Sequence, residues 1–190
     1  MASHLLRPVQ PTNYSSAGNH HSLNPIRLMD NQLVSLAKDL GVLFKSKGEV
    51  IVTAESCTGG GIAQTLTDIP GSSAWFDRGF VTYSNASKIQ MLGVKPQSLA
   101  TFGAVSSETA TEMALGALKN SSATQAVAVT GIAGPDGGTE EKPVGTVYIA
   151  WASIRNEIFC QKFLFSGGRS EVRQQTVIEA LKIMISNTRL

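Results

Sequence analysis

The sequence predicts an α/β protein: a three-layer α/β/α sandwich around a mostly parallel mixed sheet of about five strands. Helical and strand patterns alternate along most of the chain, which is typical of parallel strands joined by helices. The continuous apolar run at residues 125–130 indicates a strand covered on both faces. Two closely spaced strand patterns at residues 144–153 and 157–165 predict a hairpin, which makes one member of the sheet antiparallel.

Residues 30–190 are expected to form a single domain that follows an extension of residues 1–29. The extension is rich in Ser, Asn and Pro and has no hydrophobic period, so we expect it to be disordered. Asp30 is a candidate N-cap for the first helix, which should end near Gly48. One apolar stripe marks its buried face: Leu33, Leu36, Ala37, Leu40, Leu43 and Phe44.

A polar, glycine-rich turn separates the first strand from the second helix. Residues 49–53 form a short β-branched run that predicts a buried strand, and residues 62–69 place apolar side chains at helical spacing. Unpaired amides at such a helix start favour a phosphate or a developing oxyanion. The structural alternative is a helix that is simply capped by a serine or threonine. The turn carries five candidate site residues: Ser56, Cys57, Thr58, Gly59 and Gly60.

The middle of the chain predicts a second strand at residues 76–83, followed by a short helix capped by Ser84. A loop is expected over residues 94–104. The next helix should run from residue 107 to about residue 119. Two serines are candidate N-caps for it: Ser106 and Ser107.

After the buried strand, a glycine-rich loop is expected at residues 131–139. It is neither a Walker loop nor a Rossmann fingerprint, because no helix follows it. It is either a long surface loop or a loop that faces a ligand, and so many glycines after a buried strand favour a ligand. The final helix should begin near Arg169.

Charge and hydropathy limit the possible partners. The net charge is +2, and two of the 16 basic residues, Arg7 and Arg27, lie in the acid-free residues 1–29. Residues 30–190 therefore carry 14 basic and 14 acidic residues, which argues against a nucleic-acid groove. No apolar run is long enough to span a membrane and no secretory signal is evident, so we expect a cytoplasmic protein.

The distribution of histidine restricts the chemistry. All three histidines lie within the first 21 residues, so the predicted domain cannot hold a Ser-His-Asp triad. A metal site is not expected, and Cys57 and Cys160 do not make a disulfide framework. Any general base must therefore be Lys, Tyr, Glu, Asp or water.

Polar residues follow several predicted strands at their carboxyl ends, where open α/β sheets bind ligands. Ser56, Tyr83 and Thr130 occupy such positions, and Lys88 lies just over one helical turn beyond Tyr83. A lysine that desolvation keeps neutral can activate a serine, alone or with a tyrosine.

Each of these residues also has a structural interpretation. Lys88 can be a solvated helix residue, and Tyr83 an aromatic residue at a strand end. Glu55 can be paired with a lysine or arginine. Cys57 is either a rival nucleophile or a small buried side chain.

Ordered sequence blocks across residues 30–187 resemble the CinA carboxyl-terminal domain family. The resemblance implies a stand-alone nicotinamide-nucleotide amidase, which converts nicotinamide mononucleotide and water into nicotinic acid mononucleotide and ammonia. It also implies a three-layer fold, no metal or other cofactor, a small-molecule substrate and a homodimer. The family's nucleophile falls on Ser56, its lysine on Lys88, and its active-site tyrosine and threonine on Tyr83 and Thr130. The matching blocks are residues 54–60, 70–73, 79–85, 88, 103–106, 129–135 and 137–147.

On this interpretation Ser56 attacks the carboxamide carbon, and Lys88 takes its proton directly or through Tyr83. The amides of residues 57–60 would hold the oxyanion. Ribose or phosphate would be bound by a further set: Thr130, the loop glycines Gly131 and Gly134, and Arg169 or Lys142 as charge partner. Two alternatives stay open: an amidase that uses Cys57, and a non-catalytic nucleotide-binding or interaction module linked to competence or DNA damage.

Overall fold

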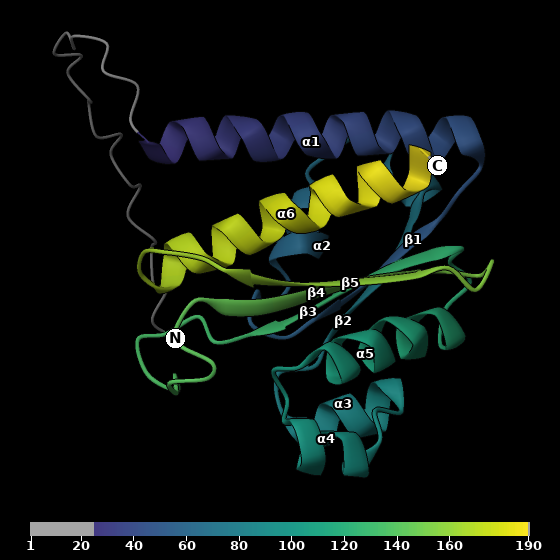
Figure 1. Ribbon diagram of the computed structural model, residues 1–190. Coiled ribbons are helices and arrows are strands. Elements are labelled where there is room, and N and C mark those ends of the chain that lie inside the picture. The colour runs from purple at the N-terminus through teal and green to yellow at the C-terminus, as the bar shows by residue number, and fades with distance from the viewer. Residues whose placement is uncertain (1–24, 190) are drawn as a thin grey trace, which may run out of the picture.

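The computed structural model describes residues 25–189, which form three layers with the sheet in the middle (Figure 1). The predicted α/β/α sandwich is confirmed. The sheet has the order β2-β1-β3-β4-β5. Its strands are β1 (Ile51–Glu55), β2 (Phe76–Val81), β3 (Gln125–Gly131), β4 (Thr146–Ser153) and β5 (Ile158–Leu164).

The strand directions confirm a mostly parallel sheet. β1 pairs in parallel with both β2 and β3, whereas β4 is antiparallel to both of its neighbours, β3 and β5. The register places Glu55 opposite Val81 on one side and Val129 on the other. The next residue, Ser56, therefore emerges between the carboxyl ends of β2 and β3.

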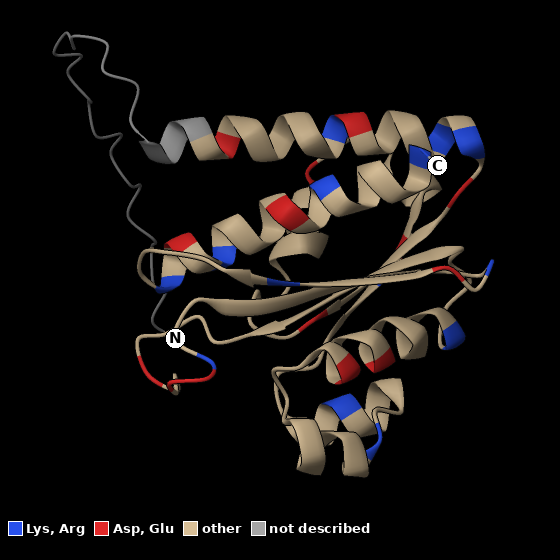
Figure 2. Cartoon of the chain, in the orientation of Figure 1, with Lys and Arg blue, Asp and Glu red and all other residues tan. Residues whose placement is uncertain are grey.

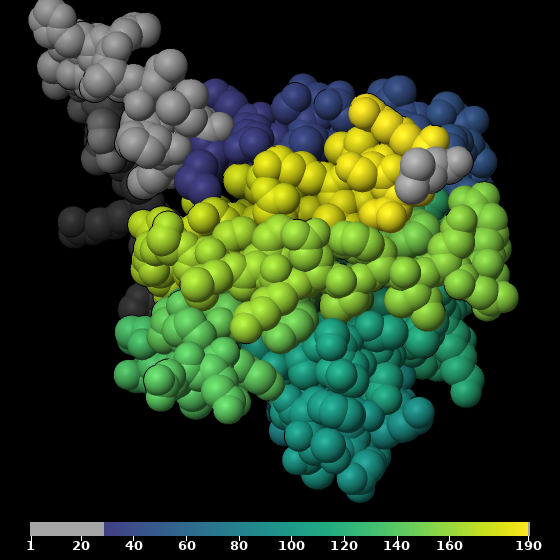
Figure 3. All heavy atoms as spheres, in the orientation of Figure 1, coloured from purple at the N-terminus to yellow at the C-terminus, as the bar shows by residue number. Residues whose placement is uncertain are grey.

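One face of the sheet is covered by α1 (Pro25–Lys47), α2 (Gly61–Thr67) and α6 (Arg169–Arg189) (Figure 1). Large side chains from these helices fill the core beneath them, among them Leu40, Phe44 and Leu181, which are fully buried. On the face shown in Figure 3, α6 lies between α1 and the β4–β5 hairpin. Burial of this apolar surface is the main term that stabilises the layer.

The other face is covered by α3 (Asn85–Leu92), α4 (Pro96–Phe102) and α5 (Ser107–Lys119) (Figure 1). Here the sheet presents mostly small residues, which lets α5 pack close to the strands. These residues are Ala54, Ala126, Ala128, Ala150 and Ala152. α3 also approaches α5 closely, because a Cβ on Gly116 would lie 1.9 Å from Leu92 O. This packing fixes α3, which carries Lys88.

Most predicted boundaries agree with the structure to within a few residues, and two differ in an informative way. α1 begins at Pro25, so Asp30 lies inside the helix and is not its N-cap. The predicted extension therefore loses residues 25–29 to this helix, and its remainder lies outside the described residues. β2 ends at Val81, which leaves Tyr83 beyond the strand.

The prediction of a loop over residues 94–104 was wrong, because residues 96–102 form α4. Its N-terminus is satisfied by a side chain from α5: Glu112 accepts hydrogen bonds from Lys95 N at 2.8 Å and Ser98 Oγ at 2.7 Å. The cap comes from a residue distant in sequence, so local patterns did not reveal it.

Acidic and basic residues are interspersed along α1 and α6 (Figure 2). Within the described part of the chain, no helix is long and apolar enough to cross a membrane. The expectations of a cytoplasmic location and of no nucleic-acid partner stay predictions.

Candidate active site

The turn between β1 and α2 has the backbone that its glycines permit. Gly59 and Gly60 have φ values of 61° and 95°, which residues with a Cβ rarely adopt. Ser56 N donates to Val129 O at 3.0 Å, and Thr82 N donates to Glu55 O at 2.8 Å. The start of the turn is thus held between the two strands that flank β1.

Glu55 organises this turn through its buried carboxylate. Oε2 accepts hydrogen bonds from Thr58 Oγ1 at 2.7 Å and Ile62 N at 3.0 Å, and Oε1 accepts from Ala63 N at 2.8 Å and Thr53 Oγ1 at 3.3 Å. The carboxylate therefore caps α2, since it accepts two amides of the first turn.

Two expectations about this turn are corrected. Neither Ser56 nor Thr58 caps α2, because its N-cap is Gly60 and the first-turn amides bind Glu55. Glu55 is also not paired with a lysine or arginine among the described residues; hydroxyl groups and backbone amides compensate its charge. Because its four partners are neutral, they satisfy the buried carboxylate without an ion pair.

Ser56 and Lys88 are brought together. Lys88 Nζ lies 3.0 Å from Ser56 Oγ and donates to Thr82 O at 2.8 Å. The lysine is only 1% exposed, so burial lowers its pKa below the usual value, although nearby Cys57 acts in the opposite direction. The interpretation of Lys88 as a solvated helix residue is therefore wrong.

The position of Lys88 follows from a strong local start signal. Ser84 Oγ accepts from Ser87 N at 3.0 Å, and Ser87 Oγ accepts from Ser84 N at 3.1 Å, which is a reciprocal capping box. The predicted N-cap at Ser84 is confirmed. The helix starts there, so Lys88 lies one turn later and its side chain returns to the end of β1.

Cys57 adjoins the nucleophile candidate, but its surroundings disfavour the charged thiolate form. The residue is 5% exposed, and burial raises the pKa of its thiol to about 12. A thiol with such a pKa is almost entirely protonated at neutral pH and is a weak nucleophile. The structure therefore favours Ser56 over Cys57.

Tyr83 lies at the mouth of the site and contacts Arg169. Its hydroxyl accepts a hydrogen bond from Arg169 Nη2 at 2.7 Å, and Arg169 Nη1 donates to Gly134 O at 2.9 Å. The tyrosine is 60% exposed. Within the described residues its hydroxyl has no hydrogen bond to Ser56 or Lys88, so in this geometry it is not a relay between them.

A cavity of about 220 Å³ joins these groups. Of the predicted site residues, seven line it: Ser56, Cys57, Tyr83, Lys88, Thr130, Gly131 and Arg169. Thr130 is buried, and its hydroxyl donates to Ala104 O at 2.7 Å. Four lining residues were missed: Asn85, Ala104, Val105 and Ala133. Asn85 and Ala133 were visible as neighbours of strand ends, but Ala104 and Val105 carry no chemical signal.

Other predicted residues lie outside this cavity lining: Thr58, Gly59, Gly60 and Gly134. Gly134 takes part only through its carbonyl oxygen, which binds Arg169. Gly131 is confined, since a Cβ there would lie 2.6 Å from Val147 Cγ2. Lys142 is directed elsewhere, because its Nζ donates to Phe102 O at 2.8 Å.

The turn amides are only partly available for an oxyanion. Gly59 N donates to Ser56 O at 3.0 Å, and so it is occupied. Within the described chain, the amides of Cys57, Thr58 and Gly60 donate to no backbone carbonyl. Cys57, which follows Ser56 directly and lines the cavity, places its amide beside the nucleophile candidate.

In the part of the chain that the structure describes, no three His, Cys, Asp or Glu side chains cluster as metal ligands. The expectation of a metal-free, cofactor-free site stays a prediction.

Comparison with known proteins gives consistent matches. The chain is 52% identical over 157 residues to the nicotinamide-nucleotide amidohydrolase PncC of Escherichia coli, covering 83% of this chain and 95% of that protein. It is 50% identical to the protein of the same name from Pseudomonas putida, covering 78% of this chain and 92% of the relative.

Solved structures agree. The competence/damage inducible protein CihA from Agrobacterium tumefaciens has a TM-score of 0.80 and 50% identity, covering 82% of this chain and 94% of that one. A CinA superfamily protein from Klebsiella pneumoniae has a TM-score of 0.80 at 34% identity, covering 83% and 98% of the two chains. The model of the CinA C-terminal domain matches residues 33–188. That match contains the sheet, the turn at Ser56 and nearly the whole described chain. This protein therefore belongs to the CinA C-terminal domain family.

Proposed function

We propose that this protein is an amidohydrolase that converts nicotinamide mononucleotide and water into nicotinic acid mononucleotide and ammonia, in the recycling of pyridine nucleotides. The observation that carries the proposal is the 3.0 Å approach of Lys88 Nζ to Ser56 Oγ at a cavity. The names of its relatives from Escherichia coli and Pseudomonas putida supply the substrate.

The geometry supports direct proton transfer from Ser56 to Lys88. A neutral lysine amine can donate to Thr82 O and still offer its lone pair to the serine hydroxyl. Burial favours this neutral form. Ser56 Oγ then bonds to the carboxamide carbon while Lys88 takes the hydroxyl proton, and the protonated lysine returns that proton to the departing ammonia.

Hydrolysis of the resulting ester completes the reaction. Water adds to the acyl carbon, Lys88 accepts its proton, and Ser56 Oγ leaves and is reprotonated. The proposed oxyanion donor is the backbone amide of Cys57, the residue that directly follows Ser56. One such donor is typically worth about 10²–10³-fold in rate.

Arg169 is the proposed partner of the substrate phosphate. It lines the cavity, and its contacts with Tyr83 and Gly134 use only part of its five N–H donors. Thr130 and Gly131 would face the ribose. Lys142 is less suitable because it does not line this cavity. A homodimer stays a prediction.

The direct test is release of ammonia from nicotinamide mononucleotide by the purified protein. We expect turnover by the wild type and by the control Lys38→Met, whose exposed side chain lies on α1. Lys88→Met should abolish turnover while preserving binding of the nucleotide. Binding without any turnover in the wild type would instead favour the non-catalytic nucleotide-binding module.

A further inference from the structure

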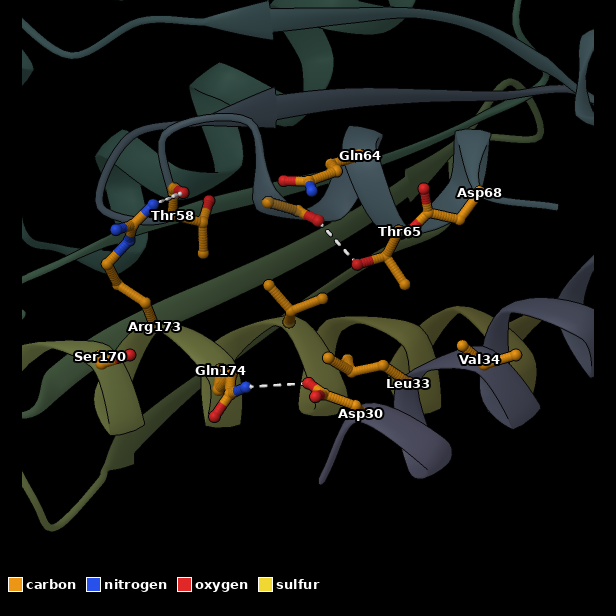
Figure 4. Close-up of a pocket in the computed structure, with 12 residues that line it drawn as sticks. Asp30, Leu33, Val34, Thr58, Gln64, Thr65, Asp68, Ser170, Arg173 and Gln174 are labelled. Atoms are coloured by element: carbon orange, nitrogen blue, oxygen red, sulfur yellow. Dashed lines mark hydrogen bonds between the residues drawn. The ribbon is translucent and has the colours of Figure 1, made fainter. Parts of the chain in front are cut away.

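A second, larger cavity lies between α1, α2 and α6. Its volume is about 340 Å³, against about 220 Å³ for the cavity at Ser56. Thr58 lines it, but none of the proposed catalytic or phosphate-binding residues does. Figure 4 shows side chains from all three helices directed toward this space. Its size falls within the range of about 300–1,000 Å³ that is usual for small-molecule sites.

One end of the cavity is positively charged. Arg173 Nη2 donates to Thr58 O at 2.7 Å, whereas the buried Nε of Arg173 has no hydrogen-bond partner among the described residues. No carboxylate in the described part of the chain lies within salt-bridge distance of this guanidinium. An arginine with unused donors and no counter-ion is suited to an oxyanion with several acceptor oxygens.

A second feature reinforces that end. Ser170 lines the cavity from the first turn of α6, one turn before Arg173. Backbone amides of a first helical turn lack intrahelical acceptors, and the helix dipole there favours negative charge. The hydroxyl of Ser170 has no partner among the described side chains, so it is a further donor for the same anion.

The other end is lined by acceptors. In Figure 4, Arg173 lies at one end of the cavity and Asp68 at the other, with Asp30 between them. Asp30 Oδ1 accepts from Gln174 Nε2 at 3.4 Å, and within the described residues Asp68 has no side-chain partner. Carboxylates are acceptors only, so this end is suited to hydroxyl donors. Val34 adds an apolar wall.

We propose that this cavity is a second ligand site, for a sugar phosphate or nucleoside monophosphate. The phosphate monoester would bind Arg173 and Ser170, and the sugar hydroxyls would donate to Asp30 and Asp68. The ligand would contact Arg173, whose side chain donates to Thr58 O. Through this hydrogen bond it would be linked to the turn that carries Ser56. The site does not depend on the proposed amidase activity.

Calorimetric titration with ribose 5-phosphate tests the proposal on the full chain. The probe has the phosphate and hydroxyls but no amide to hydrolyse. Val34→Trp, at a 40% exposed position, should fill the cavity and weaken binding by about tenfold or more. The matched control Val42→Trp lies on the same helix at 71% exposure and outside the lining, so its affinity should equal that of the wild type.

Three further titrations locate the bound probe. Arg173→Lys keeps the charge but loses the planar fork, so it should also weaken binding. Arg169→Gln alters the proposed phosphate partner in the other cavity. It should remove any binding of the probe there and leave the binding that Val34→Trp weakens. Inorganic phosphate should bind more weakly than ribose 5-phosphate.

The proposal is overturned if ribose 5-phosphate does not bind, or if Val34→Trp binds it as the wild type does. Loss of binding in Arg169→Gln with retention in Arg173→Lys would place the probe in the catalytic cavity, and would equally overturn it. Because the measurement uses no nicotinamide nucleotide, a failure of the amidase proposal is read separately.

Discussion

Glu55 accepts a 2.7 Å hydrogen bond from Thr58 Oγ1, so the last residue of β1 holds the turn that carries the nucleophile candidate. Each carboxylate oxygen of Glu55 also accepts one backbone amide of α2. With the hydroxyl of Thr53, four donors therefore converge on the two carboxylate oxygens of Glu55.

Glu55→Gln should therefore destabilise the protein. In either orientation the new amide group turns N–H donors toward a backbone N–H donor, which leaves buried groups unsatisfied at a cost of about 1–3 kcal/mol. Urea denaturation measures the loss. Glu140→Gln, at an exposed loop position, is the control and should leave the free energy of unfolding unchanged. Equal stabilities of the two variants would contradict the capping role.

Lys88→Arg should fail almost as badly as Lys88→Met. Guanidinium keeps its proton throughout the accessible pH range, so it cannot accept the proton of Ser56. In the wild type, kcat/KM should fall as the pH drops through the lowered pKa of Lys88, because protonation removes the base. The measurement is kcat/KM against pH. Near-normal turnover by the arginine variant would show that only the positive charge is required.

Ser56→Ala should reduce turnover by about a thousandfold or more, as expected for loss of a nucleophile. Cys57→Ala should keep a measurable fraction, because the thiol, with its pKa near 12, does not act as thiolate at neutral pH. Initial rates of ammonia release compare the two variants. The reverse pattern would establish the Cys57 mechanism instead.

Tyr83→Phe should raise KM more than it lowers kcat. The hydroxyl of Tyr83 binds Arg169, the proposed phosphate partner, and has no contact with the Ser56–Lys88 pair among the described residues. Arg169→Gln should raise KM by roughly 10–100-fold, the range expected for a charge-assisted hydrogen bond. Tyr148→Phe, on β4, is the control. A Tyr83→Phe variant with unchanged KM and much lower kcat would restore the tyrosine as a proton relay.

The sequence by itself determined the class of fold and several local features. The strand at residues 125–130 and the cap Ser84 were predicted because apolar patterning and capping depend on neighbouring residues. Of the two candidate caps for α5, Ser106 and Ser107, the structure selects Ser106. Because residues 30–190 contain no histidine, the sequence also made a lysine a candidate for the general base.

Only the tertiary structure decided which side chains meet. Glu112 caps α4 across 14 to 17 residues, and Arg169 meets Tyr83 across 86 residues, so no local pattern records either contact. The low pKa of Lys88 likewise arises from burial, which exists only once α3 packs against α5. The sequence supplied the reacting groups, and long-range packing set their distances and their protonation.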